Sequence, residues 1–487
     1  MSLPGRFIRG VLLSGGGMVV ALGSGLVALK LITNAPALSE ADIGVYAMFV
    51  AVTDFFVSLN GFGMRTALPK LIGSADAAGK RSLVNATLTA QSGVSLALGL
   101  VIFAVWWLAP VPALLAENDS WNRLYPYLYI LPAFLLVFTL RELLLAMQAG
   151  LHQYVSRTLG LTGYAVVQVV LVAALVWYAE GALTTLLWVI AAANAAAVLL
   201  LLALLRLPLR PVRDLRSWCG GVRFARPLWI NNLFGYVFNR MDTLLVGALL
   251  GPAAAGIFDI GAKRLPQYAV SVLNASLVPF LPSLAERLAR DDRAGATRLM
   301  LQVYDMFAFL GYAGLLFTLL VQGPLVRLAF SEAYAAALPV LGWMLAAGLL
   351  ALQTGIFGQS LVALGRPRPI AVINILLALV SLGLNVLFIP RFGIAGAGYA
   401  AVIAIGVSHM LHAGCVHLSG MRFGLWPYLR PHSNLAGALA LLFVLRQYGL
   451  GAGAPLAALS LFLALAPVTG LLKPNQVRRV LAGLRHG

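Results

Sequence analysis

Charged side chains inside long apolar segments are the residues of this sequence best suited to chemistry. Five are basic, namely Lys30, Arg141, Arg240, Lys263 and Arg264. Five are acidic, namely Asp54, Glu142, Asp242, Asp259 and Asp305. A charge at the centre of a bilayer costs about 2.5–3.5 kcal/mol, so such a residue normally faces a polar cavity or a partner. The bases could hold an anion there, and the acids are candidates for coupling to H⁺ or Na⁺.

Sequence spacing leads to different expectations for two pairs of opposite charge. Arg240 and Asp242 are two positions apart and do not share a helical face, so we expect at least one of them to find a partner in another helix or in a cavity. Asp259 and Lys263 are four apart, on one face and with the acid first. Mutual neutralisation is therefore an alternative to a functional role for the second pair.

Structural roles also remain open for other members of the set. Lys30 and Arg264 lie near the outer ends of their segments, where a long side chain can reach the membrane surface. Arg141 and Glu142 are neighbours and can pair with other helices. Asp305 lies close enough to the cytoplasmic end of its segment to be solvated.

The segments that carry these residues predict an all-α polytopic membrane protein. A bilayer core about 30 Å thick needs roughly 20 apolar residues of helix, and 61% of this chain is hydrophobic. About fourteen segments qualify, at residues 11–32, 43–64, 83–108, 124–147, 159–178, 182–205, 227–250, 256–281, 301–322, 336–363, 370–389, 396–417, 433–447 and 453–472.

The distribution of positive charge predicts the orientation of these segments. Most of the 34 basic residues fall in every second gap between them, among others in 65–81, 206–226, 287–298 and 473–485. Because cytoplasmic loops carry the Lys/Arg excess, we expect both termini in the cytoplasm. The net charge of +18 then reflects topology and attraction to anionic lipid headgroups, not binding to nucleic acid.

An internal repeat predicts two lobes. Gly44-Val45-Tyr46 is echoed by Gly256-Ile257-Phe258, and 68–71 (LPKL) by 281–284 (LPSL), at an offset of 212–213 residues. Six helices per unit give both halves the same orientation, a parallel repeat about an axis along the membrane normal. We predict a first lobe at 1–206, a basic cytoplasmic linker at 207–226, a second lobe at 227–420, and two further helices with a basic tail at 421–487.

Other residue patterns argue against common chemistries. His409, His412, Cys415 and His417 resemble metal ligands, but only the first two clearly share a helical face. No phosphate-binding G-x-x-x-x-G-K-[ST] loop occurs, so ATP is not expected as the direct energy source. We predict no catalytic residue, no metal ion and no cofactor.

Several motifs, in order along nearly the whole chain, resemble bacterial polysaccharide flippases of the Wzx type, members of the multidrug/oligosaccharidyl-lipid/polysaccharide exporter superfamily. They stand at 38–46 (LSEADIGVY), 239–242 (NRMD) with Gly247 and Gly251, 256–258 (GIF) with Lys263, 363–366 (ALGR), and Asn385 with 389–398 (IPRFGIAGAG). One departure is Phe258, where a tyrosine is expected.

The resemblance implies a substrate and a place of action. Such flippases move an undecaprenyl-pyrophosphate-linked oligosaccharide across the bacterial inner membrane, with lipids, H⁺ or Na⁺, and polysaccharide polymerase and assembly proteins as expected partners. It also favours Lys30 as a cavity cation for the pyrophosphate, because related lipid II flippases carry a cavity arginine at the matching place. We hypothesise that some of the cations Lys30, Arg240, Lys263 and Arg264 converge on the cavity and hold the pyrophosphate. Asp54, Arg141, Glu142, Asp242, Asp259 and Asp305 are then the candidates for lining the cavity or coupling an ion.

Two other functions are alternatives to that of a polysaccharide flippase. A multidrug-extruding antiporter of the same superfamily typically has twelve helices and uses acids to bind cationic drugs; the balance of five buried bases and five acids does not decide between the two. A membrane-embedded polysaccharide polymerase or ligase generally presents a large outward loop with catalytic residues. No outward gap here is long enough for one.

Overall fold

The computed structural model describes residues 3–108, 117–178, 183–275, 277, 280–451 and 453–472. Within these ranges the chain is almost entirely helical and contains no strand. The predicted all-α class is therefore confirmed. The predicted basic tail after residue 472 lies outside the described residues.

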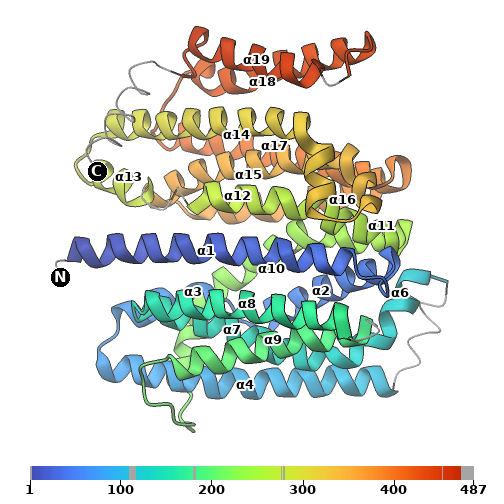
Figure 1. Cartoon of the computed structure of the whole chain (residues 1–487). Helices are drawn as coiled ribbons and strands as arrows, with labels where there is room; N and C mark the ends of the chain where they lie inside the picture. The colour runs from blue at the N-terminus through green and yellow to red at the C-terminus, as the bar shows by residue number, and fades with distance from the viewer. Residues whose placement is uncertain are drawn as a thin grey trace. The chain divides into compact units, whose positions relative to one another are not determined.

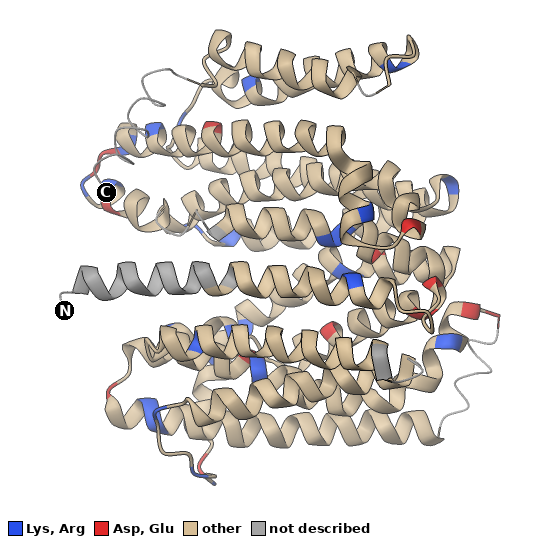
Figure 2. Ribbon diagram, viewed as in Figure 1, with Lys and Arg blue, Asp and Glu red and all other residues tan. Residues whose placement is uncertain are grey.

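Ten helical segments in the described part of the chain are long and apolar enough to cross a membrane. They are Glu40–Asn60, Ala77–Leu108, Asp119–Gly150, Tyr154–Val176, Leu183–Ala203, Arg216–Leu250, Arg293–Ala329, Glu332–Ala363, Arg368–Phe392 and Ile394–Leu418. Val19–Thr33 and Gly453–Val468 are apolar but shorter. The protein is thus a multi-pass membrane protein, while the number fourteen stays a prediction. Figure 2 shows long helical stretches without charge, and charged residues mostly toward helix ends and connections.

The chain divides into two compact units. The first comprises Met1–Ile260, Leu328–Tyr334 and Asn385–Ile394. Its helices are α1 (Leu3–Thr33), α2 (Glu40–Asn60), α3 (Met64–Ser74), α4 (Ala77–Leu108), α6 (Asp119–Leu124), the 3₁₀ helix η1 (Tyr125–Ile130), α7 (Leu131–Gly150), α8 (Tyr154–Tyr178), α9 (Leu183–Ala203), α10 (Arg216–Leu250) and α11 (Pro252–Gly256). Helix α1 packs along α8, α4 along α7, and α10 along α2 (Figure 1).

The second unit comprises Gly261–Arg327, Ala335–Leu384 and Ala395–Gly487. Most of its residues lie in α12 (Leu265–Ala275), α13 (Phe280–Ala289), α14 (Arg293–Ala329), α15 (Leu338–Ala363), α16 (Arg368–Phe392), α17 (Ile394–Leu418), α18 (Leu425–Gln447) and α19 (Gly453–Val468), with a 3₁₀ helix η3 (Glu332–Ala337) before α15. The ends of α14 and α16 and the start of η3 belong to the first unit. Helices α18 and α19 pair as a hairpin, red in Figure 1, and share an apolar cluster with α14. The predicted lobe boundaries and the parallel repeat stay predictions.

The predicted span 256–281 is not one regular helix. It consists of the end of α11, a π-helix η2 (Ile257–Arg264) and α12. A π-helix closes i→i+5 hydrogen bonds and often marks a functional site. Asp259 and Lys263, which the i,i+4 spacing predicted to share a face, both belong to this π-helix.

The predicted linker 207–226 is helical from Arg216 onward, because α10 begins there and not at residue 227. The physical reason is packing. Trp218, Val222 and Ala225 recur at helical spacing and pack on the apolar cluster of the first unit. The basic gap at 287–298 is also helical on both sides, since α13 ends at Ala289 and α14 begins at Arg293.

Close packing of α2 on α11 explains one of the repeated glycine motifs. A Cβ atom on Gly44 would lie 1.6 Å from the carbonyl oxygen of Pro252, and one on Gly256 would lie 2.9 Å from the backbone nitrogen of Gly44. Both contacts are with backbone, which cannot move aside as a flexible side chain can. The two matching glycines therefore hold the helix that leads into η2 against α2.

We expect Gly44→Ala to destabilise the protein by about 1–3 kcal/mol, the usual cost of overpacking. Gly93→Ala in α4 is the matched control, because a Cβ there meets nothing within 4 Å and alanine favours helix. Thermal unfolding of both variants in detergent checks the prediction. Equal unfolding temperatures for the two variants would contradict it.

Candidate functional site

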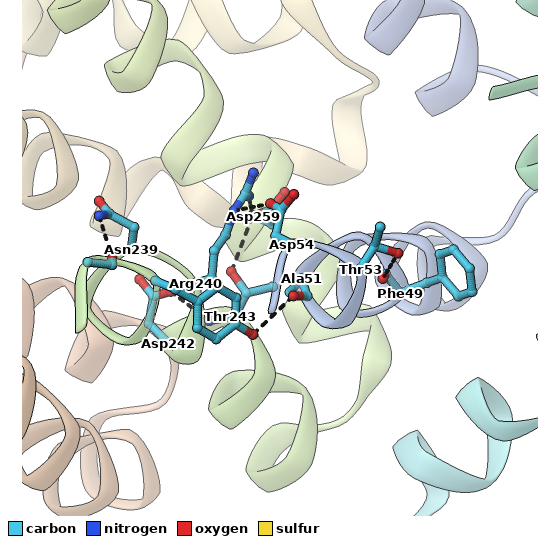
Figure 3. A network of polar contacts seen from close by, with 11 residues as sticks. Phe49, Ala51, Thr53, Asp54, Asn239, Arg240, Asp242, Thr243 and Asp259 are labelled. Atoms are coloured by element: carbon cyan, nitrogen blue, oxygen red, sulfur yellow. Dashed lines mark hydrogen bonds and ion pairs between the residues drawn. The ribbon is translucent and has the colours of Figure 1, made fainter. Parts of the chain in front are cut away.

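The candidate site lies in the first unit, where α2, α10 and η2 bring three predicted site residues together. Arg240 Nε lies 2.8 Å from Asp54 Oδ2, and Arg240 Nη1 lies 3.5 Å from Asp259 Oδ1. Figure 3 shows the guanidinium of Arg240 directed toward both carboxylates. As expected from the sequence, Arg240 finds its partners on other elements and not in Asp242.

Neutral hydrogen bonds fix the helices around this ion-pair cluster. Thr243 Oγ1 donates to Asp259 Oδ1 at 3.2 Å, and the backbone N–H of Thr243 donates to Asp242 Oδ1 at 2.8 Å. One turn earlier, the hydroxyl of Tyr236 donates to the carbonyl of Ala51 on α2 at 3.0 Å. The backbone of α10 is thereby set against α2, so the position of Arg240 is determined by the fold.

The three side chains of the cluster, Arg240, Asp54 and Asp259, differ in their exposure to solvent, and two of the three are acidic. The side chain of Asp259 is 1% exposed, whereas those of Arg240 and Asp54 are 20% and 28% exposed. One base against two acids gives the trio a net charge of −1 when all are ionised. A guanidinium has five N–H donors, and the two ion pairs engage only part of them. Arg240 can therefore contact an additional anion from its open side, or exchange a carboxylate for one.

The four predicted cavity cations are divided between the two units. Lys30 belongs to the first unit with Arg240, and its Nζ donates to the carbonyl of Phe330 at 2.6 Å. Lys263 and Arg264 belong to the second unit, at the end of η2. Lys263 is buried. Their role as a set of phosphate ligands stays a prediction.

Arg141 and Glu142 form a second charged cluster in the first unit. The sequence predicted that they pair with other helices. In the structure they pair with each other, since Arg141 Nη2 donates to Glu142 Oε1 at 2.8 Å. Arg141 also contacts another helix, because its Nη1 donates to Asn194 Oδ1 on α9 at 2.6 Å. Arg65 on α3 adds an ion pair to Glu142 Oε2 at 3.2 Å. The Arg141 guanidinium carbon also lies 4.9 Å from the ring centroid of Tyr164.

This cluster borders a cavity of about 150 Å³. Its polar lining consists of Arg141, Glu142, Tyr164 and Gln168, and Ala21 of α1 and Leu201 of α9 are among its apolar lining. Arg141 Nε is buried and has no hydrogen-bond partner. A cavity within membrane helices that is lined in part by polar groups is a site that water can enter.

We expect Glu142→Gln to destabilise the protein by about 3 kcal/mol, because it leaves the buried Arg141 charge uncompensated. Asp119→Asn is the matched control. It removes the acid of an exposed pair with Arg123, whose side chains are 54% and 68% exposed, and such pairs contribute about 0–1 kcal/mol. Thermal unfolding in detergent compares the two variants. A control as unstable as Glu142→Gln would show that burial does not set the cost.

In the second unit, Asp305 is buried and accepts two hydrogen bonds from Arg430 of α18. Sequence reasoning placed Arg430 in a solvated gap and so missed this pair. It also missed a cluster of tyrosine and histidine side chains beside it, of which His409 was considered only as a metal ligand. The described residues contain no group of three or more His, Cys, Asp or Glu side chains that could hold a metal ion.

Residues 35–339 match a family described as polysaccharide biosynthesis protein. The chain belongs to this family. The resemblance predicted from its motifs is thereby confirmed. Among curated proteins, it is 24% identical over 200 residues to the probable flippase AglR of Haloferax volcanii, which covers 41% of this chain and 40% of that protein. The chain thus spans about two fifths of the length of this relative.

Solved structures share the fold over most of the chain. The lipid II flippase MurJ in an inward closed conformation superimposes with a TM-score of 0.71 at 11% identity, covering 95% of this chain and 98% of that one. An inward-facing multidrug resistance transporter of the MATE family gives 0.64 at 12% identity, with 83% and 95% covered. The chain therefore has a transporter fold like that of MurJ and the MATE-family transporter.

Proposed function

We propose that this protein translocates a polyprenyl-pyrophosphate-linked oligosaccharide from the cytoplasmic to the periplasmic leaflet of a bacterial inner membrane by alternating access. The match to polysaccharide biosynthesis proteins and the similarity to probable flippases support a flippase-type transporter. The observation that carries the proposal is Arg240, held between Asp54 and Asp259 within apolar helices yet partly exposed.

The chemistry of the proposed substrate matches a polar site bordered by apolar helices. Sugar hydroxyls and a pyrophosphate cannot cross hydrocarbon unaided, because buried polar groups without partners cost several kcal/mol each. Arg240 offers a planar guanidinium suited to bidentate contact with phosphate. Lys30, Lys263 and Arg264 are proposed to add charge during alternating access, while the prenyl chain stays in lipid.

The remaining parts of the proposal concern setting and energy. We place both termini in the cytoplasm, as the distribution of basic residues predicts. Coupling to a gradient of H⁺ or Na⁺ through the buried acids is proposed to drive transport. Polymerase and assembly proteins would receive the product at the periplasmic face.

Reconstituted vesicles test the function directly. The purified chain is placed in liposomes with a polyprenyl-pyrophosphate oligosaccharide labelled on its sugar, and an impermeant reagent quenches label in the outer leaflet. We expect quenching to proceed beyond the outer-leaflet fraction seen without protein. The same glycan on an uncharged polyprenyl carrier, as control, should be moved more slowly. Quenching that never exceeds the protein-free level would refute the proposal.

A second candidate function is export of organic cations by a multidrug-type antiporter. Asp54 favours it, because this carboxylate of an apolar helix is 28% exposed and could attract a cation. The same vesicles, loaded with a fluorescent cationic dye, distinguish the two. Dye movement driven by an ion gradient, without movement of the labelled glycan, would assign the protein to this second function.

A further inference from the structure

A buried cluster of histidine and tyrosine side chains joins four helices of the second unit. Tyr304 and Tyr312 come from α14, His409 from α17, His432 from α18 and Gln353 from α15. All except His432 are buried, and His432 is half-buried. These groups lie in helices that are otherwise apolar, and no part of the proposed substrate path requires them.

His432 lies at the centre of this cluster and bridges the two tyrosines. Its Nε2 lies 2.8 Å from the hydroxyl of Tyr304, and its Nδ1 lies 2.8 Å from the hydroxyl of Tyr312. Each hydroxyl has a further acceptor. Tyr304 donates to the carbonyl of Tyr428 at 3.1 Å, and Tyr312 donates to Gln353 Oε1 at 3.3 Å.

Counting hydrogens decides which form of His432 fits this arrangement. The four contacts need four hydrogens, and the two hydroxyls supply one each. A neutral imidazole adds one, so one contact lacks a hydrogen. A protonated imidazole adds two and satisfies all four, since each ring N–H then donates to a tyrosine oxygen whose own hydrogen is directed onward.

A rotation of Gln353 accommodates the neutral ring. The Gln353 Nε2 group is buried and has no hydrogen-bond partner in the present orientation. If the amide turns by 180°, Nε2 donates to the Tyr312 oxygen and the Tyr312 hydroxyl is free to donate to Nδ1 of a neutral His432. The network thus has one satisfied arrangement with the proton and another without it.

The cluster also offers a route deeper into the unit. The Tyr304 hydroxyl lies 3.5 Å from Nε2 of His409, whose Nδ1 lies 3.1 Å from Thr354 Oγ1. His409 is 2% exposed. If the Tyr304 hydroxyl turns its hydrogen from the Tyr428 carbonyl to His409 Nε2, it can pass that hydrogen to His409 while its oxygen accepts the Nε2 proton of His432. The tyrosine is then unchanged, and one positive charge has moved inward.

The charged and titratable groups around His432 come from three helices. Asp305 and Arg430 neutralise each other, so a bound proton adds one net positive charge to the cluster. The groups that face or adjoin His432 are Tyr304, Asp305 and Tyr312 of α14, His409 and His412 of α17, and Tyr428 and Arg430 of α18.

We propose that His432, held between Tyr304 and Tyr312, is a proton-binding site of the second unit, with His409 as its inner relay partner. The bound ligand is a proton taken from water, and its uptake and release would couple transport to a proton gradient. That coupling rests on the proposed function, whereas the binding of the proton does not. The site belongs to the second unit, whereas the acids around Arg240 belong to the first.

Proton binding is tested without any glycan. The full-length protein, labelled with ¹⁵N-histidine, is placed in nanodiscs and titrated by NMR. We expect one of the titrating histidine signals to be absent in His432→Gln, shifted in Tyr312→Phe and unchanged in His152→Gln. His152→Gln is the matched control, because His152 also contacts a tyrosine, Tyr154 at 3.1 Å, but is exposed. A His432 ring that stays singly protonated throughout would overturn the proposal.

Coupling is tested in the glycan-flipping vesicles with an imposed pH gradient. We expect the gradient to stimulate the wild-type protein, and the stimulation to be lost in His432→Gln and Tyr304→Phe while transport without a gradient persists. A structural role would lower both rates together and leave their ratio unchanged, which would refute the coupling. If the wild type moves no glycan but His432 still titrates, the proposed function fails and the proton site stands.

Discussion

Replacing Arg240 by alanine is expected to lower transport of the lipid-linked oligosaccharide by about 100-fold while the protein still enters the membrane. Hydrogen bonds to charged groups contribute about 1.5–3 kcal/mol, and a factor of ten in rate or affinity corresponds to about 1.4 kcal/mol. Arg240→Lys should retain part of the activity, because it keeps the charge but not the planar fork. Initial rates of flipping in vesicles, normalised to inserted protein, provide the measurement.

A double variant separates binding of the substrate from structural pairing. Arg240→Ala leaves Asp54 and Asp259 without their shared base, so the single variant is also expected to be less stable. The double variant Arg240→Ala with Asp54→Asn removes one of these two acidic charges and so reduces the repulsion between them. It should recover thermal stability without recovering transport. If the double variant transports like the wild type, Arg240 serves only to neutralise the acids, and the cationic contact with pyrophosphate is wrong.

The sequence alone located the charged residues of the site but not their partners. Charge inside an apolar segment is visible in one dimension, and helical spacing correctly excluded a pair between Arg240 and Asp242. Asp54 lies far from Arg240 in sequence, and only the packing of α10 on α2 brings them together. No periodicity within one segment could have shown this.

Backbone irregularity was the second feature that hydropathy could not predict. The residues 256–264 are apolar enough to continue a helix, so a single span was the natural expectation. The structure has a π-helix there, preceded by the tight contact of Gly44 with Pro252. That contact depends on which helices meet, and hydropathy along one segment does not report this.

The histidine and tyrosine cluster was missed for a different reason. Each member is uncharged and tolerated singly in an apolar helix, and tyrosine counts as hydrophobic in composition. A usable signal was present, since His409 and His412 stood out within one apolar segment. His432 was not connected with them because the predicted span began one residue later, at 433. The connection exists only where α14, α17 and α18 meet.

Breaking the pair between Asp305 and Arg430 is expected to be among the most destabilising single changes in the second unit. Their side chains are 9% and 12% exposed, and Arg430 Nε lies 3.2 Å from Asp305 Oδ1 as one of two contacts. Asp305→Asn leaves a buried guanidinium without its counter-charge, which typically costs about 3–5 kcal/mol. Thermal unfolding in detergent measures the loss, with the exposed-pair variant Asp119→Asn as control.

Exchanging the two charges tests whether the pair itself provides the stability. Asp305→Arg and Arg430→Asp should each be severely destabilised, whereas the double exchange restores opposite charges across α14 and α18. A double-mutant cycle isolates this coupling. Because the apolar cluster of Ala308, Tyr312, Ala438 and Phe462 also joins α14 to the α18–α19 hairpin, partial and not full recovery is expected. Additive losses in the double exchange would show that the hairpin is held by apolar packing alone and that the ion pair contributes nothing.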